Sequence, residues 1–223
     1  MKLYGLFART ARLVYRIFKP HKVVGKIPDS PSVFVVHHQN MSGPVHALLT
    51  LPVQAHIWVL KVFFDRKECF NQYMNYTFTK RFGMPKILAA PLAFIISLAV
   101  PMVMHSFSAI PVNRSSRDIL KTFQLSQKAL INGENLIISP DVDYDDDSRS
   151  MGEIYTGFLH LEKNYFKETK KHLSFVPMSY NTKEHTLFIA DAIQFNDETP
   201  YNIQKEQVAK RIKDTINDIN KGL

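Results

Sequence analysis

Apolar residues recur along the chain in short blocks that are separated by polar segments containing turn residues. Short β-branched or apolar runs predict strands at 33–36, 110–112, 136–138, 175–180 and 187–190. Apolar residues at helical spacing predict helices over 118–131, 153–166 and 203–219. Because strands and helices alternate, the pattern predicts an α/β fold: one domain with a central, mainly β-sheet flanked by helices.

The first 28 residues carry seven basic side chains and no acidic one. At helical spacing, the apolar residues form one arc and most of the basic residues lie opposite, which predicts a basic amphipathic helix that ends at Pro20. Two interpretations stay open: the apolar arc enters a membrane interface, or it packs on the protein's own core. We expect residues 1–28 to form a membrane-associating helix and residues 29–223 to form the α/β domain.

A second apolar feature is the uncharged stretch 87–104, ILAAPLAFIISLAVPMVM. Its length is at the lower limit for crossing a bilayer, and Pro91 and Pro101 each remove a backbone hydrogen-bond donor. We therefore predict two short apolar helices that contact one leaflet.

Composition and charge narrow the classes of function. The 223 residues are 45% hydrophobic and 22% charged, as in a globular protein, so fibrous and wholly disordered chains are excluded. The net charge of +8 divides into +12 over residues 1–139 and −4 over residues 140–223. Without aromatic-plus-basic stacking motifs, the basic part favours a membrane surface over nucleic acid. The single Cys69 excludes an intramolecular disulfide, and no secretory signal is visible, so we expect a cytoplasmic protein.

Candidate chemistry begins directly after the run 33–36, at His37 and His38. The carboxyl end of a strand is where α/β sheets usually bind ligands, and histidine suits proton transfer near neutral pH. Adjacent residues of a strand point to opposite faces, so one of the two histidines at most occupies the site.

Four segments follow one another in an informative order: VVHHQNMSGP, then AIPVNR, then IISPD with YTGFLHL, then FVPMSY. Together they resemble the four motif blocks of the glycerolipid acyltransferase superfamily, which includes the 1-acylglycerol-3-phosphate acyltransferases. The resemblance covers about residues 30–195 and implies an acyltransferase-like α/β fold. In that family a histidine, oriented by an aspartate five residues later, deprotonates a hydroxyl that attacks an acyl thioester.

The resemblance implies site residues at matching positions. His38 falls on the catalytic histidine, and Asp141 falls on the glutamate of the third block, where it either binds acceptor hydroxyls or orients His38. The residues expected to bind substrate are His37, Asn40, Arg114, Pro140, Gly157, Val176 and Pro177.

The sequence also departs from the family pattern. Gly43 stands five residues after His38, and Ser42 stands five after His37, so the motif aspartate is absent. In the third block, Tyr144 stands where a phosphate-binding arginine is usual, within an acidic run of five aspartates in 141–147. Such a run repels phosphate unless a cation intervenes.

Three accounts of these departures stay open. In the first, His38 is oriented by another group, such as a backbone carbonyl, Asp141 or Asp143, and the acceptor lacks a phosphomonoester. In the second, the acidic run binds Mg²⁺ or Ca²⁺, although its spacing does not fit an EF-hand. In the third, catalysis is lost and the fold persists as a membrane-associated lipid-binding protein.

We expect the first account: an O-acyltransferase that moves a fatty acyl group from coenzyme A or acyl carrier protein to a glycerolipid-type hydroxyl. It would act at the cytoplasmic face of the membrane, in phospholipid biosynthesis. No metal and no cofactor beyond the thioester co-substrate are expected. The partners are membrane lipids and the acyl carrier, and the alternative is the inactive lipid-binding protein.

Overall fold

The computed structural model of the protein describes residues 3–113, 119–143 and 148–222. The chain divides into two compact units, a smaller one formed by residues 1–10 and 58–122 and a larger one formed by residues 11–57 and 123–223. Arg114 and residues 144–147, which include three aspartates of the acidic run, lie outside the described residues.

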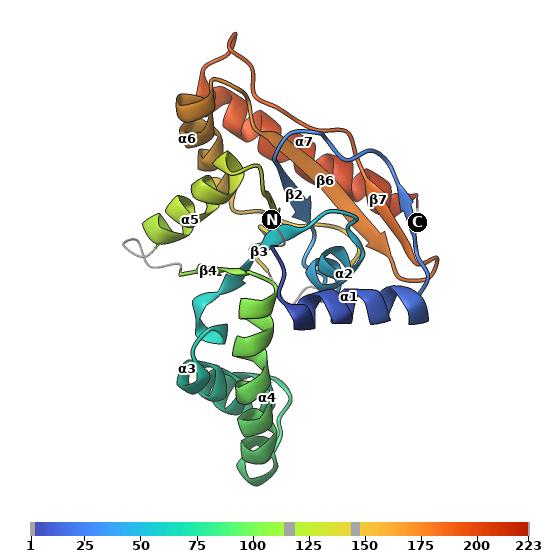
Figure 1. The fold of residues 1–223 in the computed structure, drawn as a ribbon, viewed down its shortest axis with the longest axis vertical. Coiled ribbons are helices and arrows are strands. Elements are labelled where there is room, and N and C mark those ends of the chain that lie inside the picture. The colour runs from blue at the N-terminus through green and yellow to red at the C-terminus, as the bar shows by residue number, and fades with distance from the viewer. Residues whose placement is uncertain (1–2, 114–118, 144–147, 223) are drawn as a thin grey trace. The chain divides into compact units, whose positions relative to one another are not determined.

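The larger unit contains most of the sheet and its helices. Its strands are β1 (Lys22–Val24), β2 (Ser32–Val36), the first half of β3 (Ala55–Leu60), β5 (Asn135–Ile138), β6 (Ser174–Asn181) and β7 (Thr186–Ile189). Its helices are α2 (Ser42–Thr50), most of α5 (Ile119–Ile131), the 3₁₀ turn η3 (Thr156–Leu159), α6 (His160–Thr169) and α7 (Tyr201–Lys221). Figure 1 shows α7 running beside β6.

The strands are ordered β1-β7-β6-β2-β5-β3-β4. Only β6 and β7 pair in antiparallel fashion among the strand pairs of the described residues. All residues of β2 and β6 are buried, which is typical of central strands covered on both faces. Since β2, β5 and β6 are parallel, the residues that follow them meet at one edge of the sheet. That edge carries His37, Asp141 and Thr182.

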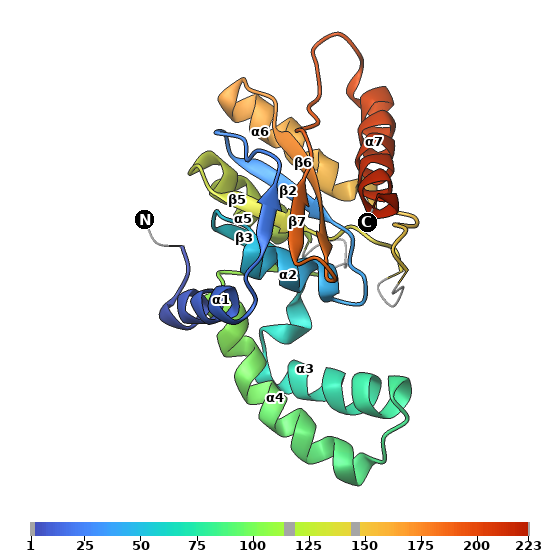
Figure 2. The ribbon, with the colours of Figure 1, turned by 90° about the vertical axis from the view of Figure 1, so that its right-hand side faces the viewer.

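The smaller unit is mainly helical. It contains the second half of β3, η1 (Lys61–Phe63), α3 (Arg66–Asn71), the π-helical η2 (Gln72–Arg81), α4 (Lys86–Ser106) and β4 (Ile110–Val112). Figure 2 shows α3 and η2 lying along α4. Cys69 is buried in α3, where burial raises the pKa of its thiol, so it stays protonated at neutral pH.

The prediction of two short helices over 87–104 was wrong, because α4 is one helix of 21 residues with both prolines inside it. Each proline removes one backbone hydrogen bond, but every other residue of the stretch favours a continuous apolar helix. By length and composition, α4 is suited to crossing a membrane, and most of its surface is exposed.

Helix α1 (Leu6–Phe18) begins in the smaller unit and ends in the larger one. Its polar face lies against the protein: Arg12 is buried and donates to the carbonyl of Leu51, and Arg16 donates to the same oxygen at 3.1 Å. Leu51 caps the carboxyl end of α2, where carbonyl groups lack helical partners and attract cations. The apolar arc is left exposed, namely Leu6, Phe7, Leu13, Val14, Ile17 and Phe18.

The other sequence-predicted elements are largely confirmed. Strands β2, β4, β5, β6 and β7 and helices α5 and α7 lie within two residues of their expected bounds. The helix expected over 153–166 starts later, as η3 and then α6, because residues 153–155 instead run beside the segment after β5. Strand β3 and helix α2 were not predicted.

Candidate active site

The loop that follows β2 has a strained backbone. Gln39, Asn40 and Met41 have φ angles of 43°, 51° and 73°, so three successive residues with side chains adopt the left-handed conformation. That conformation is sparsely populated by residues other than glycine, and such strain is concentrated at functional sites. The loop turns the chain directly from β2 into α2 and so fixes the course of the backbone after His38.

Asp141 connects both histidines to the end of β5. One of its carboxylate oxygens, Oδ1, contacts Nδ1 of His37, and the other accepts a hydrogen bond of 3.0 Å from the backbone N–H of His38. Asp141 and His37 are both 2% exposed. We call this arrangement the Asp141 bracket, because one carboxylate holds a histidine ring and the next residue's backbone.

The second ring nitrogen of His37 is also engaged. Nε2 lies 3.1 Å from the carbonyl oxygen of Ser148. A carbonyl only accepts hydrogen bonds, so Nε2 carries a hydrogen here, and a further proton lies between Nδ1 and Asp141. In this conformation the His37–Asp141 pair therefore holds its protons on both sides of the ring.

His38 lies in a different environment. Its ring is partly exposed, and its Nδ1 accepts a hydrogen bond of 3.2 Å from the backbone N–H of Met41. A nitrogen that accepts has no hydrogen, so neutral His38 carries its hydrogen on Nε2. This is the opposite tautomer to that of a histidine whose Nδ1–H is held by a carboxylate.

Gly43 explains why the motif aspartate is absent. A Cβ atom at this position would lie 1.9 Å from the carbonyl oxygen of His37 and 3.2 Å from Cγ2 of Val36. No side chain fits there without moving the start of α2. The carboxylate near the histidines therefore comes from Asp141, 104 positions after His37.

Asp141 is held in place by a short antiparallel contact after β5. Asp141 bridges to Ile154, Val142 N–H donates to Glu153 at 3.0 Å, and Tyr155 N–H donates to Pro140 at 2.8 Å. The carboxylate is thus positioned by backbone hydrogen bonds on both of its flanks.

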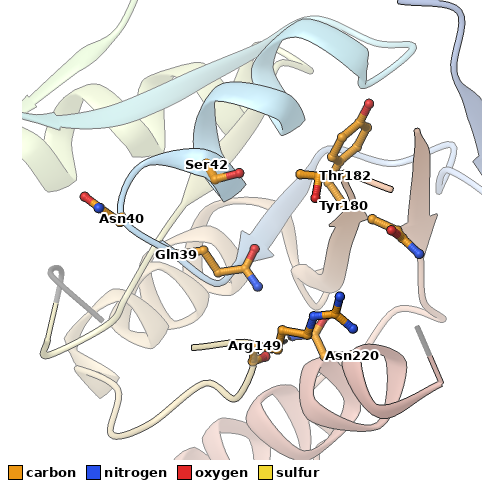
Figure 3. Close-up of a pocket in the computed structure, with 8 residues that line it drawn as sticks. Gln39, Asn40, Ser42, Arg149, Tyr180, Thr182 and Asn220 are labelled. Carbon is orange, nitrogen blue, oxygen red and sulfur yellow. Dashed lines mark hydrogen bonds between the residues drawn. The ribbon is translucent and has the colours of Figure 1, made fainter. Parts of the chain in front are cut away.

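A polar hollow with a volume of about 390 Å³ adjoins this loop (Figure 3). It is lined by four amides, three hydroxyls and one guanidinium: Gln39, Asn40, Asn181 and Asn220; Ser42, Tyr180 and Thr182; and Arg149. Figure 3 shows Gln39 and Arg149 pointing into the same space, whereas Asn40 extends away from it. The hollow is suited to forming many hydrogen bonds rather than to holding an apolar chain.

Helix α7 anchors the Arg149 side of the hollow. Asn220 donates to the carbonyl of Arg149 at 2.6 Å and accepts from Ser179 at 2.5 Å. Asn217 donates to the carbonyl of Met151 at 3.2 Å and accepts from its N–H at 2.6 Å. The polypeptide that follows the acidic run is therefore fixed beside His37.

The sequence interpretation missed Arg149, Tyr180, Asn181 and Asn220. For Asn220 a signal existed: the buried stripe of α7 runs through Val208, Ile212 and Ile216, and Asn220 is its next member. A polar residue that continues a buried apolar stripe needs hydrogen-bond partners, and here these partners are Ser179 and Arg149.

A cluster of rings lies at the Tyr180 side of the hollow. His46 stacks on Tyr180 with 4.3 Å between ring centroids, and its Nδ1 lies 2.6 Å from the carbonyl oxygen of Ser42. Burial of the ring is the main cause that lowers the pKa of His46, so it is neutral at pH 7. The pKa of Tyr180 is raised, mainly by burial and then by its contact with the Tyr15 hydroxyl.

The structure brings together His37, His38, Asn40 and Asp141 of the sequence-predicted site residues, with Pro140 directly before Asp141. Val176 and Pro177 are buried inside β6, opposite Phe34 and Val35 of β2, so they build the sheet. Gly157 lies in η3 with open space around it, so no close approach requires a glycine there. The expected Arg114 lies outside the described residues.

The structure bears only partly on the acidic run. Asp141 is committed to His37 and His38, and Asp143 is exposed. Within the described ranges, which omit 144–147, the structure contains no group of three or more histidine, cysteine, aspartate or glutamate side chains suited to holding a metal ion.

Comparison with known proteins gives a match at the level of fold. No family model matches the chain, and no curated protein matches its sequence. Among solved structures, the chain is similar to the crystal structure of the 1-acyl-sn-glycerophosphate (LPA) acyltransferase PlsC from Thermotoga maritima. The TM-score is 0.52 at 10% identity, over 96% of this chain and 78% of that one. The chain thus shares the mixed α/β fold of a PlsC acyltransferase.

Proposed function

We propose that the protein is an acyltransferase that moves a fatty acyl group from a thioester, on coenzyme A or acyl carrier protein, to a hydroxyl of a glycerolipid-type acceptor. The observation that carries this proposal is the Asp141 bracket at the carboxyl ends of β2 and β5. It supplies a histidine–carboxylate pair within an acyltransferase-like fold although Gly43 excludes the motif aspartate.

Within this proposal, His37 is the general base and Asp141 is its orienting partner. The resemblance in sequence favours His38 for this role, but the carboxylate contacts the ring of His37, and His38 carries its hydrogen on Nε2. His37 first has to lose its contact with the Ser148 carbonyl, which occupies Nε2. Nε2 then takes the proton of the acceptor hydroxyl, the oxygen attacks the thioester carbonyl, and the carbon–sulfur bond breaks to release the thiolate.

We further propose that the protein works at the cytoplasmic surface of a membrane. The support is the exposed apolar arc of α1, in which Phe18 is 80% exposed, and the exposed apolar residues of α4, in which Ile87 is 87% exposed. The arginines of α1 that face the protein cap α2, so the helix presents its apolar side outward. An exposed apolar surface of this kind favours contact with lipid.

A second candidate function is lipid binding without catalysis. It is favoured by one observation: both ring nitrogens of the buried His37 are occupied, one by Asp141 and one by Ser148. A pair that never leaves this state serves only to fix the loop.

Thiol release from acyl coenzyme A and acyl carrier protein tests the two functions. We would measure it with purified full-length protein on vesicles that contain a panel of lysolipid and polyol acceptors. His37→Gln is expected to abolish acceptor-dependent release. A matched control, His56→Gln, removes the ring of another carboxylate-paired histidine, 2.9 Å from Glu134, and should leave release unchanged.

The outcomes separate the possibilities. Loss in His38→Gln with activity kept in His37→Gln would return the base to the position that the sequence resemblance favours. Absence of release in the wild type on every acceptor, together with tight vesicle binding, would support the non-catalytic function instead.

A further inference from the structure

We propose that the polar hollow beside the Asp141 bracket binds the acceptor's headgroup, and that this headgroup is a neutral polyhydroxyl group, a sugar or a polyol, rather than a phosphate monoester. The inference rests on the proposed acyltransferase function, because it names the substrate class of the same site. The walls of the hollow continue directly from the bracket: Gln39 follows His38 in the chain, and Arg149 follows the Ser148 carbonyl that His37 contacts.

The first argument is the chemistry of the lining. Four amides and three hydroxyls surround the hollow, and none of the described residues that line it is a carboxylate or an aliphatic side chain. Amides donate and accept hydrogen bonds at once, and this matches hydroxyl groups, each of which donates one bond and accepts others. A ligand with several hydroxyl groups would satisfy such a wall.

The second argument is charge. A phosphate monoester carries close to two negative charges and is usually bound by several cations or by backbone N–H groups. Within the part of the chain that the structure describes, Arg149 is the one charged residue that lines the hollow. A neutral headgroup needs no further cation, and one guanidinium serves it as a fork of hydrogen-bond donors.

The third argument concerns the amino end of α2, which adjoins the hollow through Ser42. Helix amino ends commonly bind phosphate through their free N–H groups. Here the N–H of Ser42 donates to Gln39 at 3.1 Å, that of Gly43 donates to His38 at 3.2 Å, and Pro44 has none. The first turn therefore has no such group left for a phosphate.

The fourth argument is that the hollow is preformed. Asn220 holds the backbone of Arg149 from one side, and His37 holds that of Ser148 from the other. Asn181 accepts from the N–H groups of Lys183 and Glu184 at 2.9 and 3.2 Å, which fixes its side chain. Walls fixed before binding reduce the entropy cost of holding a ligand.

The test compares two acceptors with the same acyl chain in neutral vesicles: a monoacylglycerol that carries a hexose, and 1-acylglycerol 3-phosphate. We expect kcat/KM for the hexose acceptor to be at least about tenfold higher. Gln39→Met and Thr182→Val should each raise KM for the hexose acceptor about 5- to 20-fold, because they remove hydrogen bonds at nearly constant shape. Gln207→Met, an exposed substitution on α7, is the matched control and should have no effect.

A separate binding measurement distinguishes failure of this inference from failure of the proposed function. Calorimetric titration with a short alkyl hexoside below its micelle concentration needs no catalysis. Binding that Gln39→Met and Thr182→Val weaken, without any acyl transfer, would support the hollow's specificity and overturn only the enzyme. Preference for the phosphate acceptor, or hexoside binding that these variants leave unchanged, would overturn the inference.

Discussion

Two carboxylates in the larger unit make the same pair of contacts at opposite ends of the sheet. Asp141 holds the ring of His37 and the backbone N–H of His38, and Glu162 of α6 holds the ring of His172 at 2.6 Å and the backbone N–H of Leu173 at 2.8 Å. We call the latter arrangement the Glu162 bracket. In each, one carboxylate fixes a histidine and the residue after it.

The surroundings of the two brackets differ. The Asp141 bracket follows β2 and β5 at their carboxyl ends, beside a strained loop and the polar hollow. The Glu162 bracket precedes β6, where His172 stacks on Phe166 at 4.6 Å and links α6 to the sheet. The comparison teaches that a histidine–carboxylate pair alone does not indicate catalysis. Its place at the ligand-binding edge of the sheet does.

The largest expected effect on stability is at Gly43. Gly43→Ala and Gly43→Asp both place a Cβ close to the His37 carbonyl, so each should lower the free energy of unfolding by on the order of 3 kcal/mol. Urea denaturation measures this loss. Gly133→Ala is a useful contrast, because Gly133 has open space around it and only its φ of 84° opposes a side chain. A stable, active Gly43→Asp protein would contradict the account of the missing motif aspartate.

The next effect compares the brackets themselves. Asp141→Asn and Glu162→Gln each leave one former partner of the carboxylate without its acceptor, at a cost of about 1–3 kcal/mol. The loss should be larger for Asp141, because His37 is 2% exposed whereas the side chain of His172 is 23% exposed. Equal losses in thermal or urea denaturation would mean that burial does not distinguish the two brackets.

A smaller effect concerns backbone strain near each bracket. Met41 and Lys170 both adopt left-handed conformations, with φ of 73° and 58°. Glycine is unstrained there, so Met41→Gly and Lys170→Gly should each change stability by no more than about 1 kcal/mol, in the stabilising direction where relief of strain exceeds the added chain entropy. Acyl transfer should fall in Met41→Gly alone, because only that loop positions the candidate site. A parallel fall in both variants would contradict this assignment.

The smallest effect is a pH dependence. The pKa of His46 is lowered from its usual 6.5, chiefly by burial, and that of His160 is lowered for the same leading reason. The unfolded chain then binds more protons, so the stabilisation is present above pH 6.5 and is lost as the pH falls below it. Because these rings are partly exposed, we expect less than about 0.5 kcal/mol for His46. His46→Gln should flatten the pH dependence of the unfolding free energy between pH 7 and 5, and an unchanged slope would contradict the assignment.

The sequence pattern predicted those parts of the fold that depend on local periodicity. Runs such as 33–36 and 175–180 became β2 and β6, and the stripe of α7 was recognised. Helix α2 was missed because Gly43 and Pro44 are typical of a loop, although proline is tolerated in the first turn of a helix. The prolines of α4 were likewise given too much weight.

The candidate site was predictable in its location but not in its contacts. The end of β2 and the end of β5 were both selected as chemical segments, and the parallel sheet brings them together. Which histidine the carboxylate contacts depends on the local turn of the chain at Gln39–Met41 and on the close approach of Gly43 to His37. Neither feature is visible in the spacing of the residues.

The central claim, that Asp141 supplies the carboxylate of an acyltransferase, is tested most directly by comparing kcat/KM for acyl transfer in Asp141→Asn and Glu162→Gln. Both variants should first be shown to be folded by circular dichroism. We expect a fall of about 10²- to 10⁴-fold for Asp141→Asn, as when a general base loses its orienting partner, and no change beyond about twofold for Glu162→Gln. Equal activities in the two folded variants would contradict the account.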